Sequence, residues 1–199
     1  GDSEKVLSEK RKVLNMRFLK NIAEMDKLLL AKRLAVAFLA MVVIFLMVSY
    51  VTGKVVIAWG ESTEYLLFWK IAGHPERGDY VVVATPEEDR FAKGKVITKQ
   101  VVCSEGDELK ITGLHYYCCS REDSGLKKCV YLGRAKLRSR KGEPVKPFNP
   151  CGTHHCVVKV PPGKFFVVNH HPDSYDSRYY GFVSFDGPYR ILYVVRPLI

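Results

Sequence analysis

The sequence has no charged residue over one long stretch, the positions from Leu34 to Gly53. As an α-helix this stretch would be roughly 30 Å long, about the thickness of the hydrocarbon core of a bilayer. No polar face appears in it, which argues against the alternative of a buried helix in a soluble domain. No small-residue cleavage site precedes the next charge, which argues against a cleaved signal peptide. We therefore expect a transmembrane helix over residues 34–53.

Cysteine is absent before Cys103, so all six cysteines follow the expected span. An even number of cysteines on one side of a span is typical of disulfides in an oxidising compartment and disfavours a cytosolic location for that part. The pairing stays open, except that neighbouring cysteines are not expected to pair with each other. The disulfide candidates are Cys103, Cys118, Cys119, Cys129, Cys151 and Cys156.

Zinc is the alternative use of these cysteines, because Cys151, His154, His155 and Cys156 form a dense cluster. Their spacing does not match that of zinc fingers, and no second Cys-x2-Cys pair supports the cluster. We expect no metal and no cofactor.

No segment with helical periodicity follows residue 70, and the sequence contains no internal repeat. Short β-branched and aromatic runs bounded by Gly, Pro, Asp or Asn predict strands instead. These runs cover residues 55–59, 79–84, 95–102, 108–112, 156–160, 164–168, 181–185 and 190–195. The expected fold is mainly β, an antiparallel barrel or sandwich. Residues 113–155 have few strand signals and four of the cysteines, so we expect a disulfide-stapled insert there.

Charge predicts how the chain is oriented. The chain of 199 residues has a net charge of +10, and residues 1–33 hold nine Lys or Arg against five acids. The segment beside a transmembrane helix that is richer in Lys and Arg usually stays on the cytoplasmic side of the membrane. Residues 1–33 are therefore expected to be a cytoplasmic tail and residues 54–199 to be exported. Apolar residues at helical spacing in the tail (Leu14, Phe18, Ile22, Met25 and Leu29) predict an amphipathic helix on the inner leaflet or against a partner helix. An exported, tethered domain without a basic groove interleaved with aromatics is not expected to bind nucleic acid.

The segment Asp173–Arg178 packs a hydroxyl, two carboxylates and an arginine into six residues. With Ser62 and Lys99 upstream, it suggests a serine-lysine pair. A serine hydroxyl is a weak nucleophile that needs a base, and a lysine is such a base only if burial lowers its pKa. Taken alone, a lysine in a strand usually faces solvent, and a serine in a loop usually has no catalytic role.

Three segments resemble type I signal peptidases. Ser62–Ile71 followed by Gly73–Val83 is similar to their nucleophile region, and Lys99–Val102 followed by Gly106-Asp107 is similar to their lysine box. His171–Val183 resembles their C-terminal signature. The likeness covers roughly residues 55–195 and is closest to the conjugative-transfer, TraF-like branch, in which a longer insert separates the serine from Gly-Asp.

The resemblance implies a role for each residue. Ser62 would be the acylated nucleophile, with its backbone N–H as an oxyanion donor, and Lys99 the general base. Ser174 would orient the lysine amine, and Asp176 and Arg178 would form an ion pair that holds the loop in shape.

Some positions depart from the family pattern. Thr63 and Glu64 stand where relatives carry Met or Leu and then Pro, and Gly60 stands where many relatives have a second oxyanion donor. The apolar cluster after the serine is expected to lie partly in the core. The residues expected on a rim that faces bilayer or substrate are Tyr65, Leu67, Phe68 and Trp69.

The sequence thus predicts a serine endopeptidase of the bacterial inner membrane, with a periplasmic domain. The uncharged run implies the lipid bilayer as a partner. The resemblance implies two more: exported precursors such as a pilin, and subunits of conjugation or type IV secretion machinery. The product would be hydrolysed or cyclised. The alternative is an inactive relative that serves as an assembly factor, which Thr63 and Glu64 favour and the retention of Ser62, Lys99 and Ser174 opposes.

Overall fold

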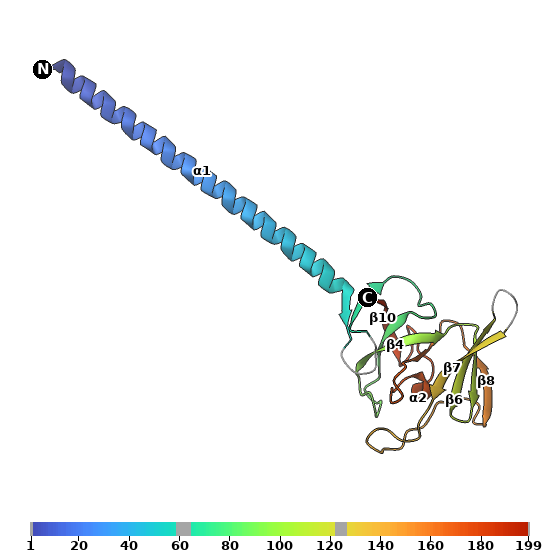
Figure 1. The fold of residues 1–199 in the computed structure, drawn as a ribbon. Coiled ribbons are helices and arrows are strands. Elements are labelled where there is room, and N and C mark those ends of the chain that lie inside the picture. The colour runs from blue at the N-terminus through green and yellow to red at the C-terminus, as the bar shows by residue number, and fades with distance from the viewer. Residues whose placement is uncertain (1, 59–64, 122–126, 199) are drawn as a thin grey trace. The chain divides into compact units, whose positions relative to one another are not determined.

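A computed structural model of the chain, shown in Figure 1, describes residues 2–58, 65–121 and 127–198. The chain forms two compact units, Gly1–Gly53 and Lys54–Ile199. The first unit is helical, and the second is built from β-strands.

The N-terminal unit is one helix, α1 (Asp2–Lys54). Neither glycine nor proline occurs between Asp2 and Thr52, so no residue there strongly opposes helical backbone. The segment Leu29–Lys54 has 26 residues and a mean hydropathy of 2.8, which is long and apolar enough to cross a membrane. The tail helix and the span expected from the sequence are therefore one uninterrupted helix.

The larger sheet has six antiparallel strands in the order β1-β2-β10-β3-β4-β9. They are β1 (Val55–Ile57), β2 (Leu67–Ile71), β3 (Tyr80–Ala84), β4 (Val96–Cys103), β9 (Phe166–Val168) and β10 (Arg190–Pro197). Strand β3 is buried on both faces: Val81 and Val83 join one apolar cluster, while Tyr80 and Val82 pack with Phe68 in another. Burial on both faces explains why this strand is continuously apolar instead of alternating.

The smaller sheet has four antiparallel strands in the order β7-β6-β5-β8. They are β5 (Glu108–Thr112), β6 (His115–Arg121), β7 (Lys127–Arg134) and β8 (His155–Lys159). On β5, Leu109 and Ile111 are fully buried and the intervening Lys110 is exposed. These two side chains share a core with Tyr116 of β6 and Phe166 of β9, so the two sheets pack on each other there.

Two expectations about strands are wrong. Residues 113–155 are not an insert with little strand structure, because they contain β6 and β7, the latter paired along its length with β6. Residues 181–185 form no strand: Val183 makes an isolated bridge to Phe165, and the chain just before it forms the single helical turn α2 (Ser177–Tyr180). Gly181 follows that turn with φ of 80°, a conformation that interrupts an extended run.

Three disulfides join Cys103 to Cys118, Cys119 to Cys129, and Cys151 to Cys156. This confirms that Cys118 and Cys119 do not pair with each other. Adjacent side chains on a strand point to opposite faces. Cys118 therefore reaches Cys103 at the end of β4, while Cys119 meets its cross-strand partner on β7. The first bridge ties the smaller sheet to the strand that carries Lys99.

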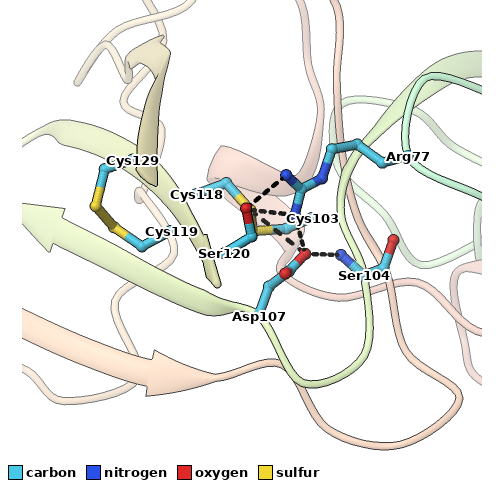
Figure 2. Close-up of a disulfide and its surroundings, with 8 residues drawn as sticks. All are labelled: Arg77, Cys103, Ser104, Asp107, Cys118, Cys119, Ser120 and Cys129. Carbon is cyan, nitrogen blue, oxygen red and sulfur yellow. Dashed lines mark hydrogen bonds and ion pairs between the residues drawn. A yellow bond between two sulfur atoms is a disulfide. The ribbon is translucent and has the colours of Figure 1, made fainter. Parts of the chain in front are cut away.

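Figure 2 shows the surroundings of the Cys103–Cys118 bridge. The guanidinium group of Arg77 donates to Asp107 over 2.6 Å and to Ser120 over 2.9 Å. Cys103, Asp107 and Cys118 also have the spacing of metal ligands, the one such grouping that the described residues contain. Their two sulfur atoms are joined to each other, however, so neither is a thiolate ligand in this state.

Candidate active site

Lys99 lies in the middle of β4, opposite Val81 of β3. Its side chain shares a face of the sheet with Val101, which is fully buried, and only 3% of Lys99 itself is exposed. The Nζ atom donates a hydrogen bond to Oγ of Ser174 over 2.8 Å. A strand lysine that usually faces water is here directed into the protein, against the loop of residues 171–181, which we call the Ser174 loop.

Burial lowers the pKa of Lys99 from 10.5 to about 8, because the charged ammonium loses its hydration. The negative charge of Asp176 opposes this shift, and the positive charge of Arg178 adds to it. With a pKa of about 8, the amine is neutral in about a tenth of the molecules at pH 7, against fewer than about one in a thousand for an ordinary lysine, and a neutral amine accepts a proton.

The Ser174 loop is held by an ion pair between Asp176 and Arg178, both buried. Asp176 caps α2 and accepts bonds from Nε and Nη2 of Arg178 over 2.8 and 2.6 Å. The hydroxyl of Ser177 accepts from the backbone N–H of Val167 on β9. Bidentate, charge-assisted bonds of this kind fix both geometry and orientation. The loop therefore presents Ser174 to Lys99 from a rigid support.

The smaller sheet holds the same loop from another side. Tyr116 donates from its hydroxyl to the carbonyl oxygens of Phe148 and Arg178, over 2.6 and 3.1 Å. The guanidinium of Arg178 reaches the carbonyl oxygen of Arg134 at the end of β7. A Cβ atom at Gly133 would lie 2.8 Å from that guanidinium, so glycine is needed for this approach. Sequence reasoning missed these supports, because they come from the segment interpreted as an insert.

Asp89, which is 7% exposed, is a second support of the Ser174 loop that the sequence did not predict. One carboxylate oxygen accepts from the hydroxyl of Tyr175 over 2.9 Å and from that of Tyr189, and the other accepts from the backbone N–H groups of Phe91 and Ala92. Burial and the bond to Asp89 raise the pKa of Tyr189 to about 12. Tyr175 directly follows Ser174, so Asp89 positions the hydroxyl that Lys99 contacts.

Lys99 and Ser174 border a cavity of about 450 Å³. Ile97, two positions from Lys99 on the same face of β4, also lines it. The remaining lining residues are Phe91, Ala92, Lys95, Arg140, His171, Asp173 and Tyr175. Lys99 thus lines a space large enough to admit a side chain of a ligand.

Ser62 lies outside the described residues, as do Gly60, Thr63 and Glu64. The apolar cluster after it is described. Tyr65 and Leu67 are 38% and 41% exposed, and Trp69 is half-buried. Phe68 is fully buried and packs with Tyr80, so its expected place on an exposed rim is wrong: it belongs to the core. Alternation along β2 sends it inward.

A family profile described as signal peptidase, peptidase S26, matches residues 27–187. The chain belongs to this family. Its members are serine peptidases with a Ser-Lys dyad that act on precursor proteins. No curated protein matches the chain significantly. A solved structure, signal peptidase I from Enterococcus faecalis, is similar at 24% identity over 63% of this chain and 100% of that chain, with a TM-score of 0.35.

This signal-peptidase chain is therefore a serine peptidase of the S26 family, with an N-terminal apolar helix consistent with a membrane anchor. Its buried lysine and the Ser174 loop lie within the matched residues. In the described chain Lys99 has a hydroxyl partner and no carboxylate within ion-pair distance.

Proposed function

We propose that this chain is a membrane-anchored serine endopeptidase in which Ser62 is the nucleophile and Lys99 the general base. The observation that carries the proposal is Lys99, which is buried, has a pKa of about 8 and lines a cavity. A lysine that serves only the fold gains nothing from a lowered pKa. A general base works best when its pKa lies near the working pH.

The chemistry follows from these groups. Neutral Lys99 accepts the hydroxyl proton of Ser62 as the serine oxygen attacks the scissile carbonyl carbon. The new ammonium gives that proton to the leaving amine as the C–N bond breaks, which leaves an ester on Ser62. Water then attacks the ester carbonyl while Lys99 accepts a proton from it; the bond between the acyl carbon and the Ser62 oxygen breaks, and Lys99 returns the proton to that oxygen as the carboxylic acid leaves. The backbone N–H of Ser62 would donate to the developing oxyanion.

Ser174, Asp176 and Arg178 act as positioning residues in this proposal. Ser174 accepts a hydrogen bond from the lysine and so limits where the amine points. Arg178 pairs with Asp176 and offsets its charge, which raises the pKa of Lys99. The ion pair therefore has two effects in this proposal: it holds the Ser174 loop in shape, and it limits how far Asp176 raises the pKa of Lys99.

We place residues 1–33 in the cytoplasm, the span over residues 34–53 in a bacterial inner membrane, and residues 54–199 in the periplasm. The excess of Lys and Arg before the span supports this orientation. The three disulfides after it fit an oxidising compartment.

We propose an exported precursor as the substrate, of the pilin type used in conjugation or type IV secretion. The support is the resemblance of Ser62–Val83 and His171–Val183 to the TraF-like branch. An ester on Ser62 can be attacked by water or by an amino group of the substrate, which gives hydrolysis or cyclisation from one intermediate.

The test is to replace Ser62 by Ala in the full chain, in cells that export the precursor. Unprocessed precursor is expected to accumulate, while Ser120→Ala, a serine of β6 in the smaller sheet, leaves processing intact. Lys99→Met is expected to match Ser62→Ala, and Lys110→Met, an exposed strand lysine, is its control. Unchanged processing with Ser62→Ala would instead favour the non-enzymatic assembly factor.

A further inference from the structure

A second cleft, of about 920 Å³, lies apart from the cavity beside Lys99, and no residue lines both. It runs between β7 with the following residues 135–138 on one side, and β4 with the residues after β9 on the other. We call it the β7 cleft. Apart from Arg178, none of its lining residues has a role in the proposed peptidase chemistry.

The lining of the β7 cleft shows which part of β7 faces it. All positions from Val130 to Arg138 border the cleft in unbroken succession. Successive side chains of a strand point to opposite faces, so a cleft on one face would be lined by alternate positions only. The cleft therefore follows the backbone edge of the strand.

That edge is open to pairing. In the described chain β7 is the outermost strand of its sheet and pairs with β6 alone. Val130 and Tyr131 are 48% and 52% exposed, so large apolar side chains border this free edge. Proteins usually block such an edge, because it can pair with any extended chain. Here it is left open beside an apolar cleft.

The charge of the β7 cleft has one sign. None of its lining residues is Asp or Glu. Of its cationic side chains, Arg77 is paired with Asp107 and Lys136 with Asp173. The other exposed cations on the lining are Arg134 and Arg138, which have no carboxylate partner in the described chain. Among the described residues, Arg138 donates only to the carbonyl oxygen of Gly142. Two guanidinium groups without a carboxylate partner, beside an apolar floor, complement a ligand that is both apolar and acidic.

We propose that the β7 cleft binds an extended acidic segment of a partner protein, which adds a strand to the free edge of β7. Main-chain hydrogen bonds to β7 would supply affinity, and alternate side chains would supply specificity. Apolar side chains of the segment lie against Leu132 and Val168, and the acidic ones between them face Arg134 and Arg138. Arg178 already occupies the carbonyl oxygen of Arg134, so the open edge runs from Val130 to Gly133; it is roughly 13 Å long and accepts about four residues.

An anionic lipid would match the charge and the apolar floor equally well. A lipid, however, does not pair with a strand edge, whereas the cleft follows the edge of β7 from Val130 to Arg134. The geometry therefore favours a peptide, and lipid binding is one outcome of the test.

The test uses the full chain in micelles of a neutral detergent and a fluorescent peptide of alternating valine and glutamate. Fluorescence anisotropy measures binding, and hydrogen exchange measures protection of the β7 amides. Saturable binding is expected, with protection of amides within residues 130–133. Replacing glutamate by lysine, or methylating alternate backbone nitrogens of the peptide, is expected to weaken binding by about tenfold or more.

Variants of the chain provide the matched control. Val130→Lys puts a charge on the proposed edge and is expected to weaken binding by about fivefold or more. Val157→Lys does the same on β8, the opposite edge of the same sheet, where Val157 is 58% exposed, and is expected to leave binding unchanged. Both positions are exposed, so both variants should fold.

Three results would overturn the proposal: no binding of the peptide to the wild-type chain, equal binding of its lysine or N-methyl forms, or equal loss of binding with Val130→Lys and Val157→Lys. Protection of the same amides by phosphatidylglycerol micelles, with none by the peptide, would assign the cleft to lipid instead.

Discussion

The Nζ atom of Lys99 lies 2.8 Å from Oγ of Ser174, although 75 positions separate the two residues in the chain. They meet because β4 pairs with β9, and the chain leaves β9 directly into the Ser174 loop. The smaller sheet and Asp89 then hold this loop from two further sides. The position of one amine thus depends on contacts from both sheets.

Ser174→Ala removes the acceptor that orients the lysine while leaving it buried. The lost hydrogen bond is worth about 1–3 kcal/mol, so we expect kcat to fall by roughly 10- to 100-fold with little change in KM. Ser174→Thr keeps a hydroxyl and should recover most of the rate. Steady-state kinetics on a precursor peptide measures both. An unchanged kcat in the alanine variant would remove Ser174 from the mechanism.

Arg178→Gln leaves Asp176 as an unpaired buried carboxylate. Breaking a buried ion pair costs about 3–5 kcal/mol of folding free energy. The uncompensated charge also raises the pKa of Lys99, so the pH dependence of activity should move to more alkaline pH.

The double variant Asp176→Asn/Arg178→Gln is the control for that prediction, because it removes both charges. We expect it to recover part of the stability and to return the pH dependence toward that of the wild type. If the double variant kept the full alkaline displacement, Asp176 would not be its cause.

Asp89→Asn tests the second support of the Ser174 loop. Burial opposes ionisation of Asp89, but hydrogen bonds from two tyrosine hydroxyls and two backbone N–H groups outweigh it and lower the pKa below 3.8. A carboxylate with a lowered pKa stabilises the fold above its unfolded pKa, and this contribution is lost as pH falls through the folded pKa. We expect the variant to be less stable by about 1–3 kcal/mol at neutral pH.

The difference in stability should shrink as the pH falls below 3.8, the ordinary value for aspartic acid. Denaturant unfolding of both proteins over a pH series measures it. A difference that stayed constant into strong acid would mean that the carboxylate charge of Asp89 contributes nothing.

Removal of different disulfides is expected to affect stability and activity differently. Cys103 and Cys118 enclose 15 positions, and Cys151 and Cys156 enclose 5. From loop entropy alone, removing the first bridge costs about 3 kcal/mol and the second about 2 kcal/mol. The first bridge also ends the strand of Lys99, so Cys103→Ala/Cys118→Ala should lower kcat as well as Tm, whereas Cys151→Ala/Cys156→Ala should lower Tm alone. Equal loss of kcat in both variants would argue against this coupling.

Local patterns predicted much of the fold. The strand over residues 108–112 was predicted at its observed bounds, because Leu109 and Ile111 alternate with polar residues. Strands β6 and β7 were missed for two reasons. Lys127, Lys128 and Arg134 obscure the alternation of apolar and polar residues on β7, and cysteines stand in place of apolar residues where Cys119 pairs with Cys129. Residues 181–185 look like a strand in composition, but Gly181 turns the chain there.

The residues of the candidate site were likewise predicted only in part. The positions of Lys99 and Ser174 were predicted from motifs that resemble a family, which encode spacing along the chain. The supports from Tyr116 and Asp89 were not predicted, because their partners, Arg178 and Tyr189, lie 62 and 100 positions away. Such contacts depend on how the two sheets and their loops pack, and no local pattern records them.

The central claim is that Lys99 acts as a neutral base, and the pH profile of kcat/KM tests it most directly. The neutral amine is the active form, so the rate should rise with pH through an apparent pKa of about 8, and Lys99→Met should abolish it. A rate that is flat across this range, or that rises only near 10.5, would contradict the claim.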